Sequence, residues 1–242
     1  MLFRSGGAAS QYNCASQNLT VAVRVEGAGS YSGTCTGSDG AYSVSGVTIN
    51  AAGDTVTIFI DGTVIAAAVT RASDTTSNIG VDLYSNAVVA RHEDAGPITS
   101  ASFSVYDSDN YNNRVPFTAN GTLVVDNGIK LFVPSGYTFT PGVDVTTNAL
   151  FVQGTFNQGA TTLTLNGGGT NTSCSTATGT MIPLCVSGTF NVGTGTTNFA
   201  GNAATTLTTI TYYNLTLNQS GTTFTLGGAT TVSNDLPLLR VR

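Results

Sequence analysis

Charged side chains are scarce in this chain of 242 residues: they make up 9% of it, where an ordinary soluble domain carries about 25%. The sequence holds one histidine, one lysine and no tryptophan. The formal charge of -5 and the isoelectric point near 4.5 argue against nucleic acid or an anionic membrane as a partner, because both would repel the chain. No apolar run approaches the roughly 20 residues that a bilayer-spanning helix needs, so no transmembrane segment is predicted.

The few charges lie mostly in one part of the chain. Twelve of the 13 acidic residues occur at or before Asp144, and the 90 residues from Val145 to Asn234 contain no Asp, Glu, Lys, Arg or His. That stretch cannot perform ordinary side-chain acid–base chemistry. It must present a polar but uncharged surface, built mainly from Thr, Asn, Ser and Gln.

Apolar residues recur with a period of two, which is typical of β-strands. Residues 19–25 and 55–61 alternate cleanly and are rich in β-branched side chains, which pack well on a pleated surface. The best helix candidate, residues 64–69, is short and lies between strand-like runs. From Val88 onward, short strands separated by glycine or asparagine turns are predicted at residues 123–125, 131–133, 137–139, 143–145 and 150–152.

An internal repeat indicates stacking. Residues 149–169 align without gaps on residues 183–203, with nine of 21 positions identical and an unbroken Gly-Thr-Phe-Asn in both copies. A unit of this kind buries its apolar face against its neighbours. Like charges would repel at the strand spacing of about 4.8 Å, so the lack of charge fits a single-stranded β-helix, or β-solenoid.

The N-terminal part carries a different pattern. Residues 36–47 read T-G-S-D-G-A-Y-S-V-S-G-V and are followed by G-D-T-V-T-I from Gly53. Asp39-Gly40 supplies a tight turn. This pattern resembles the second half of the Cna-B-like and transthyretin-like modules of bacterial surface proteins. The resemblance implies a small antiparallel β-sandwich.

Five further segments resemble recurring segments of large, secreted, adhesin-like β-solenoid proteins of uncultured bacteria; they are residues 91–97, 116–118, 139–142, 212–217 and 226–232. The resemblance implies surface display and brings no catalytic residues with it. We therefore expect an all-β chain with four parts. They are residues 1–13, a disordered, truncated or expression-derived segment; residues 14–86, the sandwich; residues 87–235, β-solenoid repeats; and residues 236–242, a truncation tail.

The four cysteines form two sequence-local pairs, Cys14 with Cys35 and Cys174 with Cys185. Neither pair has C-x-x-C spacing, which a zinc site would normally show. Two disulfides, each contributing about 3 kcal/mol in the chain-entropy model, are the favoured interpretation, and four buried thiols are the alternative. Disulfides indicate an oxidising compartment, so the chain is predicted to be secreted or displayed at the cell surface.

Several segments allow both a functional and a simpler structural interpretation. Arg91-His92-Glu93-Asp94 contains the sole histidine, but a solvated turn is favoured over a base or a metal ligand. Asp107, Asp109 and Asn113 partly resemble a calcium loop, yet Asn112 and Thr118 stand where that loop needs Gly and Glu, so a hydrated loop is favoured. An intramolecular isopeptide bond at Lys130 is disfavoured, because the residue lies outside the Cna-B-like segment. The glycine strings 167–169 and 193–195 lack the lysine of a phosphate loop and are expected to be turns.

No catalytic residue, cofactor or metal ligand is predicted. The favoured function is a non-enzymatic, structural or adhesin-type extracellular protein, whose partners are surface glycans or neighbouring surface proteins. One alternative is a carbohydrate-binding module that uses exposed tyrosines. A less favoured alternative is a polysaccharide lyase or hydrolase, which needs paired carboxylates. The tyrosine candidates are Tyr12, Tyr31, Tyr84, Tyr111 and Tyr137, and the carboxylate candidates are Asp107, Asp109, Asp126 and Asp144.

Overall fold

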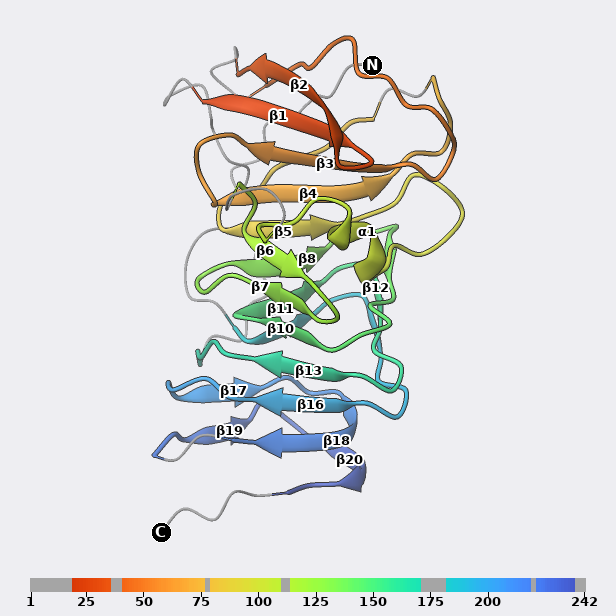
Figure 1. Ribbon diagram of the computed structural model, residues 1–242. Helices are drawn as coiled ribbons and strands as arrows, with labels where there is room; N and C mark the ends of the chain where they lie inside the picture. Colours follow the sequence, from red (N-terminus) through yellow and green to blue (C-terminus); the bar gives the residue numbers. More distant parts are fainter. Residues whose placement is uncertain are drawn as a thin grey trace.

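The computed structural model describes residues 19–35, 41–76, 79–109, 114–170, 182–218 and 221–237. Figure 1 shows that their strands stack from one end of the molecule to the other, with the N-terminal strands at one end and the last strands at the opposite end. One short helix, α1 (Ser100–Ser104), is present in these ranges. None of the described helical structure is long and apolar enough to cross a membrane. The prediction of an almost entirely β chain is confirmed.

The largest sheet has eight strands in the order β14-β11-β8-β5-β4-β3-β1-β2. Its first four strands along the chain pair antiparallel, and every pair from β4 onward is parallel. The change falls close to residue 86, where a boundary was predicted, but the sheet continues through it. The strands are β1 (Thr20–Val25), β2 (Ala28–Thr34), β3 (Thr55–Ile60), β4 (Ala66–Arg71), β5 (Ala87–Ala90), β8 (Lys130–Val133), β11 (Ala149–Val152) and β14 (Leu184–Val186).

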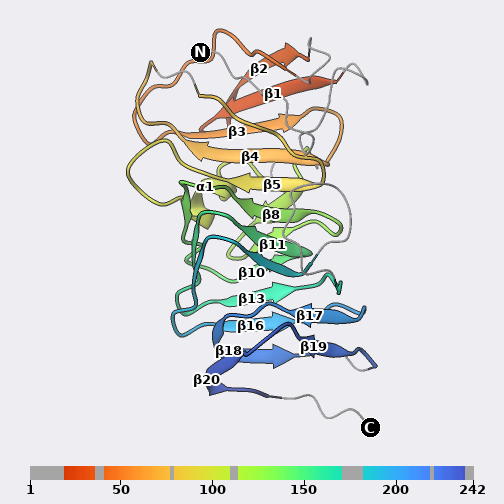
Figure 2. The same ribbon diagram turned by 180° about the vertical axis from the view of Figure 1, so that it is seen from behind.

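Three smaller sheets complete the column, and all their pairs are parallel except β6 with β7. Figure 2, seen from behind, places the eight-stranded sheet on the side of the column opposite the seven-stranded one. The seven-stranded sheet consists of β6 (Phe117–Ala119), β7 (Leu123–Val125), β10 (Val145–Thr147), β13 (Thr162–Leu165), β16 (Thr196–Phe199), β18 (Thr211–Leu217) and β20 (Thr231–Asp235). The other two sheets contain β9 (Thr138–Phe139), β12 (Thr155–Asn157) and β15 (Thr189–Asn191), and β17 (Thr205–Leu207) with β19 (Phe224–Leu226).

The internal repeat corresponds to neighbouring strands in register. Phe156 pairs with Phe190, 34 residues later, and β11 and β13 pair with β14 and β16 at the same offset. The preceding neighbours are closer in sequence, since Leu131 pairs with Leu150. The longer offset therefore reflects extra chain between β13 and β14, not a longer structural repeat.

Each position of the repeated Gly-Thr-Phe-Asn has a physical reason. A Cβ on Gly154 would collide with the carbonyl oxygen of Tyr137 in the adjacent chain segment, and Gly188 is equally close to the Gly154 carbonyl. Phe156 points inward, and its ring lies 5.7 Å from the ring of Phe139 and 5.3 Å from that of Phe190. The threonine and asparagine that flank the phenylalanine are only half-buried or exposed.

The sheets enclose an elongated apolar core. Matching residues stack along it, as Leu131, Leu150 and Leu184 do in the eight-stranded sheet. Near the N-terminal end, Phe103 of α1 packs edge-on against Phe117 at 5.2 Å, and the helix thereby covers the core there. No helix was predicted at this position, because five residues are too few to show a period of 3.6.

The outer face of the eight-stranded sheet carries a second apolar core. Val89, Phe132, Phe151 and Cys185 follow one another as strand partners, and the rings of Phe132 and Phe151 stack at 5.0 Å. This face is covered by residues 41–49 and 79–83. Strands buried on both faces read as continuous apolar runs, which explains why residues 131–133 and 150–152 do not alternate.

The two-sheet sandwich predicted for residues 14–86 is not formed by the described part of that range. The layer that covers β1–β4 has no strand of its own there, apart from the isolated bridge between Tyr42 and Cys35. Its backbone is satisfied by local contacts instead: the Asp54 carboxylate accepts the amides of Asn50 and Ala51 at 2.8 and 3.0 Å. The helix candidate at residues 64–69 folds largely as β4, which is buried between two neighbouring strands.

Candidate functional site

The cluster around the sole histidine is a hydrogen-bonded network in the loop after β5. The Arg91 guanidinium donates to Glu93 Oε1 at 2.8 Å, to the Gly80 carbonyl at 2.7 Å and to the Tyr137 hydroxyl at 2.7 Å. It also lies 4.6 Å from the Tyr137 ring centroid. Thr70 on β4 donates to the same Glu93 oxygen at 3.1 Å. Arg91 therefore joins β5, the outer covering segment and the residues before β9.

Both ring nitrogens of His92 are engaged. The backbone amide of Thr138 can only donate, so Nε2 of His92, 3.0 Å away, accepts its proton. The carbonyl of Asp94 can only accept, so Nδ1, at 2.8 Å, carries the hydrogen. Both nitrogens of the imidazole are therefore held by backbone groups of the same chain.

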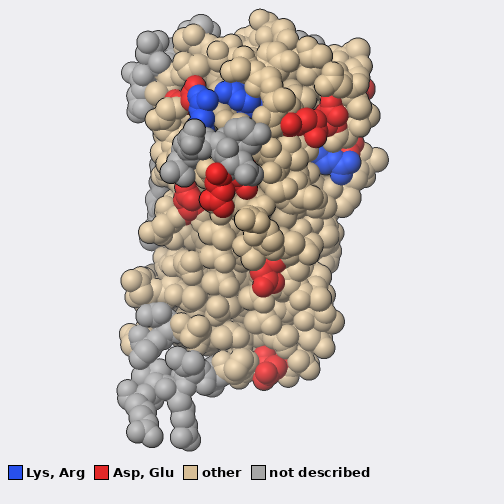
Figure 3. All heavy atoms as spheres, viewed as in Figure 1, with Lys and Arg blue, Asp and Glu red and all other residues tan. Residues whose placement is uncertain are grey.

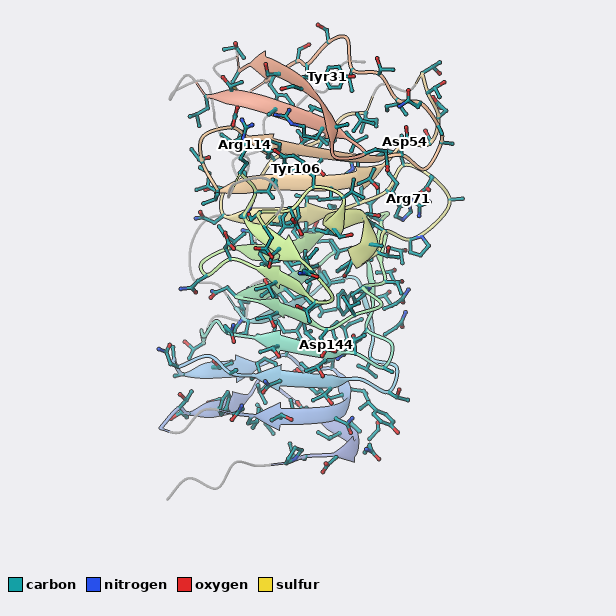
Figure 4. The ribbon with its side chains drawn as sticks, viewed as in Figure 1. Tyr31, Asp54, Arg71, Tyr106, Arg114 and Asp144 are labelled. Carbon is teal, nitrogen blue, oxygen red and sulfur yellow. The ribbon has the colours of Figure 1, made fainter. Side chains whose placement is uncertain are left out.

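A second ion pair anchors the same loop. Arg71, at the end of β4, contacts the Asp94 carboxylate at 2.6 Å and donates to the Pro97 carbonyl at 3.3 Å (Figure 4). Burial is the main cause of a raised pKa at Tyr137, so its hydroxyl stays protonated. The arrangement clamps residues 91–97 against β4, and the interpretation of this cluster as a turn is supported, with the difference that the turn is bonded rather than solvated.

The segment that partly resembles a calcium loop, for which a hydrated loop was favoured, has a structural role in its described portion. Asp107 is buried, and its Oδ2 accepts the Ala119 amide at 3.1 Å. Asp109 is exposed, whereas Asn112 and Asn113 lie outside the described residues. Among the residues that the structure covers, no group of three or more His, Cys, Asp or Glu side chains could hold a metal ion.

The remaining candidate carboxylates have separate surroundings. Asp144 Oδ1 accepts the Thr162 amide at 2.7 Å on the seven-stranded sheet. Asp126 is partly buried, and burial raises its pKa. Lys130 is buried in β8 between Ala87 and Ala149, and desolvation lowers its pKa. The structure therefore gives each of these groups its own position rather than one common cleft.

The tyrosine candidates are also partly committed to packing. Tyr84 lies edge-on to Phe132 with a centroid distance of 5.1 Å, Tyr137 is bonded to Arg91, and Tyr31 is half-buried on β2. Tyr12 and Tyr111 lie outside the described residues. A flat row of exposed rings, which a tyrosine-based carbohydrate site would need, is not formed by the three that are described.

An arginine–aromatic cluster escaped the sequence analysis. Arg24 is buried, and its guanidinium lies 5.5 Å from the Phe59 ring centroid and 5.7 Å from that of Tyr106. The guanidinium of Arg114 (Figure 4) lies 5.7 Å from the centroid of the same Phe59 ring, and it forms an ion pair with Asp61. The strand pattern of residues 19–25 contained Arg24, but nothing in that pattern reveals that aromatic rings from distant segments meet there.

The outward side of the seven-stranded sheet is regular and uncharged over most of its length. Two rows of strand-paired residues run along this side, and we call these two rows together the neutral face. Its members are half-buried polar residues. They are Thr146, Thr164, Asn198 and Thr216 in one row, and Thr162, Thr196 and Asn214 in the other.

Cys35 and Cys185 are both buried and both disulfide-bonded. They lie near opposite edges of the eight-stranded sheet, which at a strand spacing of about 4.8 Å places them roughly 30 Å apart, so they are not bonded to each other. Cys14 and Cys174 lie outside the described residues, and the pairing of Cys14 with Cys35 and of Cys174 with Cys185 stays a prediction.

Comparison of the chain with protein-family models, with curated proteins and with solved structures gave no match in any of the three. The geometry of the chain itself defines an almost all-β protein with mixed, parallel-rich sheets.

Proposed function

We propose that residues 87–235 form a β-solenoid and that the chain is a non-enzymatic structural or adhesin-type protein of the extracellular space. The observation that carries this proposal is the in-register parallel pairing of uncharged strands in the three-stranded and seven-stranded sheets. A stack of this kind extends in one direction and needs no ionic contacts on its surface. It is suited to holding a polar wall away from a cell or particle.

The surroundings of the ionisable groups support a non-enzymatic role. The histidine is bonded at both ring nitrogens, and Asp107 and Asp144 each accept a backbone amide. Hydrolysis of a glycosidic bond needs two carboxyl groups facing one substrate. The disulfide bonds at Cys35 and Cys185 support the extracellular assignment, because such bonds persist in oxidising compartments.

The proposal is tested by displaying the chain on the surface of a non-adherent bacterium and measuring attachment to glycan-coated and protein-coated surfaces, alongside release of sugar ends from a polysaccharide panel. We expect attachment without turnover. Turnover that disappears in Asp107→Asn or Asp144→Asn would establish an enzyme instead. Unreduced digests analysed by mass spectrometry test the compartment argument, since free thiols at Cys14 and Cys35 would remove it.

A carbohydrate-binding module remains the second candidate function, on a different surface from the one predicted. The tyrosines are largely occupied, whereas the neutral face offers unpaired hydroxyls.

A further inference from the structure

Only one long sheet face is open to a ligand in the described structure. The outer face of the eight-stranded sheet is covered by residues 41–49 and 79–83. The three-stranded sheet contributes strands of only two or three residues. The seven-stranded sheet remains, and it runs along most of the column (Figure 1).

The polar groups on the inward and outward sides of this sheet differ in their hydrogen bonding. Thr147 and Thr197 point inward, and their hydroxyls bond to the Ala149 carbonyl at 3.0 Å and to the Gln158 side chain at 3.3 Å. On the outward side, the hydroxyls of Thr146, Thr164 and Thr216 make no hydrogen bond to any residue that the structure describes. These outward hydroxyls are therefore available to a partner.

The available groups are regularly spaced. Successive members of a row lie one strand spacing apart, about 4.8 Å, and the two rows are two residues apart along the strands, about 6.7 Å. One sugar ring adds a comparable length to an extended, β-linked polysaccharide chain. A linear polysaccharide laid along the stacking direction would thus bring successive rings over successive strands.

The charge of the face restricts the ligand. Among the described residues, Figure 3 shows no lysine or arginine over the lower strands of this side, and the acidic patches there are isolated. Asp144 lies on this sheet and Asp235 ends β20, so an anionic polysaccharide would meet repulsion there and no compensating cation from the described residues. The chemistry of the face matches hydroxyl-rich, uncharged chains.

We infer that the neutral face binds a linear, uncharged polysaccharide through threonine hydroxyls that repeat with the strands. This inference rests on the proposed adhesive function and names its partner. Each hydrogen bond is weak, but several hydrogen bonds to one polysaccharide reinforce one another, so the affinity should rise with the length of the polysaccharide.

The test uses the full chain with soluble β-1,4-linked gluco- and manno-oligosaccharides of increasing length, insoluble cellulose, and polygalacturonate as an anionic probe. The triple variant Thr146→Val, Thr164→Val and Thr216→Val removes three outward hydroxyls while keeping β-branched side chains. The matched control is Thr138→Val, Thr155→Val and Thr189→Val, a ladder of strand partners on the three-stranded sheet. Thr→Ser at the first three positions keeps the hydroxyls, and circular dichroism checks folding of each variant.

We expect a neutral probe to bind more tightly than polygalacturonate, with affinity rising with length. The Thr→Val triple on the neutral face should weaken binding at least tenfold, while the serine triple and the control triple retain it. Tighter binding of polygalacturonate, loss of binding in the control triple alone, or no binding to any neutral probe would overturn the inference. So would slowed ice growth without sugar binding, which would assign the face to ordered water.

The two proposals fail in different ways. A displayed chain that attaches to protein-coated surfaces but binds no neutral polysaccharide contradicts this inference and leaves the adhesive function standing. A chain that attaches to nothing contradicts both.

Discussion

The residues up to Asp144 and those from Val145 onward satisfy their polar groups in different ways. The first region uses ion pairs: Arg71 on β4 pairs with Asp94 in the loop after β5 at 2.6 Å, and Arg91 pairs with Glu93 within that loop at 2.6 Å. The second region uses side-chain amides. Gln158 is buried, and its amide donates to the Thr161 and Thr196 carbonyls at 3.0 and 2.8 Å.

Amide ladders continue this pattern on the surface of the second region. Asn191 donates to Asn157 at 2.8 Å, which in turn donates to Thr140 at 3.0 Å, and Asn234 donates to Asn214 at 2.7 Å. Identical neutral side chains can stack at the strand spacing, whereas identical charges would repel. Irregular loops can use single ion pairs because no like charge lies directly above or below, and this difference explains why charge disappears where the stacking becomes regular.

The largest expected effect tests what the two regions share, the apolar interior. Phe103→Ala in the first region and Phe156→Ala in the second should each lower the free energy of unfolding by about 3–5 kcal/mol, because each ring is fully buried and would leave a cavity. Urea denaturation measures both. A loss below about 1 kcal/mol for Phe156→Ala alone would show that the second region is not held by its core.

The next largest expected loss of stability distinguishes a mostly buried ion pair from a more exposed one in the first region. Arg91→Leu should cost about 2–4 kcal/mol, since it leaves the Glu93 carboxylate without its counter-ion and the Tyr137 hydroxyl without this partner in a poorly hydrated place. Arg114→Leu is the matched control, because the Arg114 side chain is 38% exposed and its pair with Asp61 should contribute less than about 1 kcal/mol. Equal losses in urea titrations would refute the clamp.

A smaller loss of stability is expected at Gln158, the uncharged counterpart of Arg91 in the second region. Gln158→Leu removes two amide N–H donors from partly buried carbonyls and should lower stability by about 1–3 kcal/mol. Its cost should be the same in 0.1 M and 1 M salt, whereas that of Arg91→Leu should shrink at high salt. A salt-dependent cost at Gln158 would contradict the distinction between the regions.

The smallest effect concerns the lone lysine. Desolvation lowers the pKa of Lys130 in the folded state, so the unfolded chain binds the proton more tightly and stability should rise as the pH increases toward the ordinary lysine pKa. Lys130→Met should remove this contribution and leave the protein slightly more stable at neutral pH. Melting temperatures of both proteins between pH 7 and 10.5 provide the measurement, and parallel curves would contradict it.

Strand positions were predictable from sequence where one local pattern determines them. Residues 20–25 and 55–60 are strands as expected, and the repeated Phe156 and Phe190 are neighbours. The lack of charged side chains in residues 145–234 is also evident directly from the sequence. These features depend on local alternation and on self-similarity, both of which one sequence contains.

The unpredicted features depend on contacts between distant segments. The continuous apolar runs at residues 131–133 and 150–152 could have signalled burial on both faces, but the covering segments 41–49 and 79–83 have no regular pattern. The hydrogen bond from the Thr138 amide to Nε2 of His92 joins two residues that lie 46 positions apart. Spacing alone gave no indication of that contact.

The register of the uncharged strands is tested most directly by engineered disulfides. Thr155 and Thr189 are strand partners, so Thr155→Cys with Thr189→Cys should oxidise readily, and mass spectrometry of unreduced digests should find the bond. Thr155→Cys with Asn191→Cys is displaced by two residues, which places the two Cα atoms about 8 Å apart, and it should stay reduced. Efficient bonding of the displaced pair, with none in the first pair, would contradict in-register stacking and the account built on it.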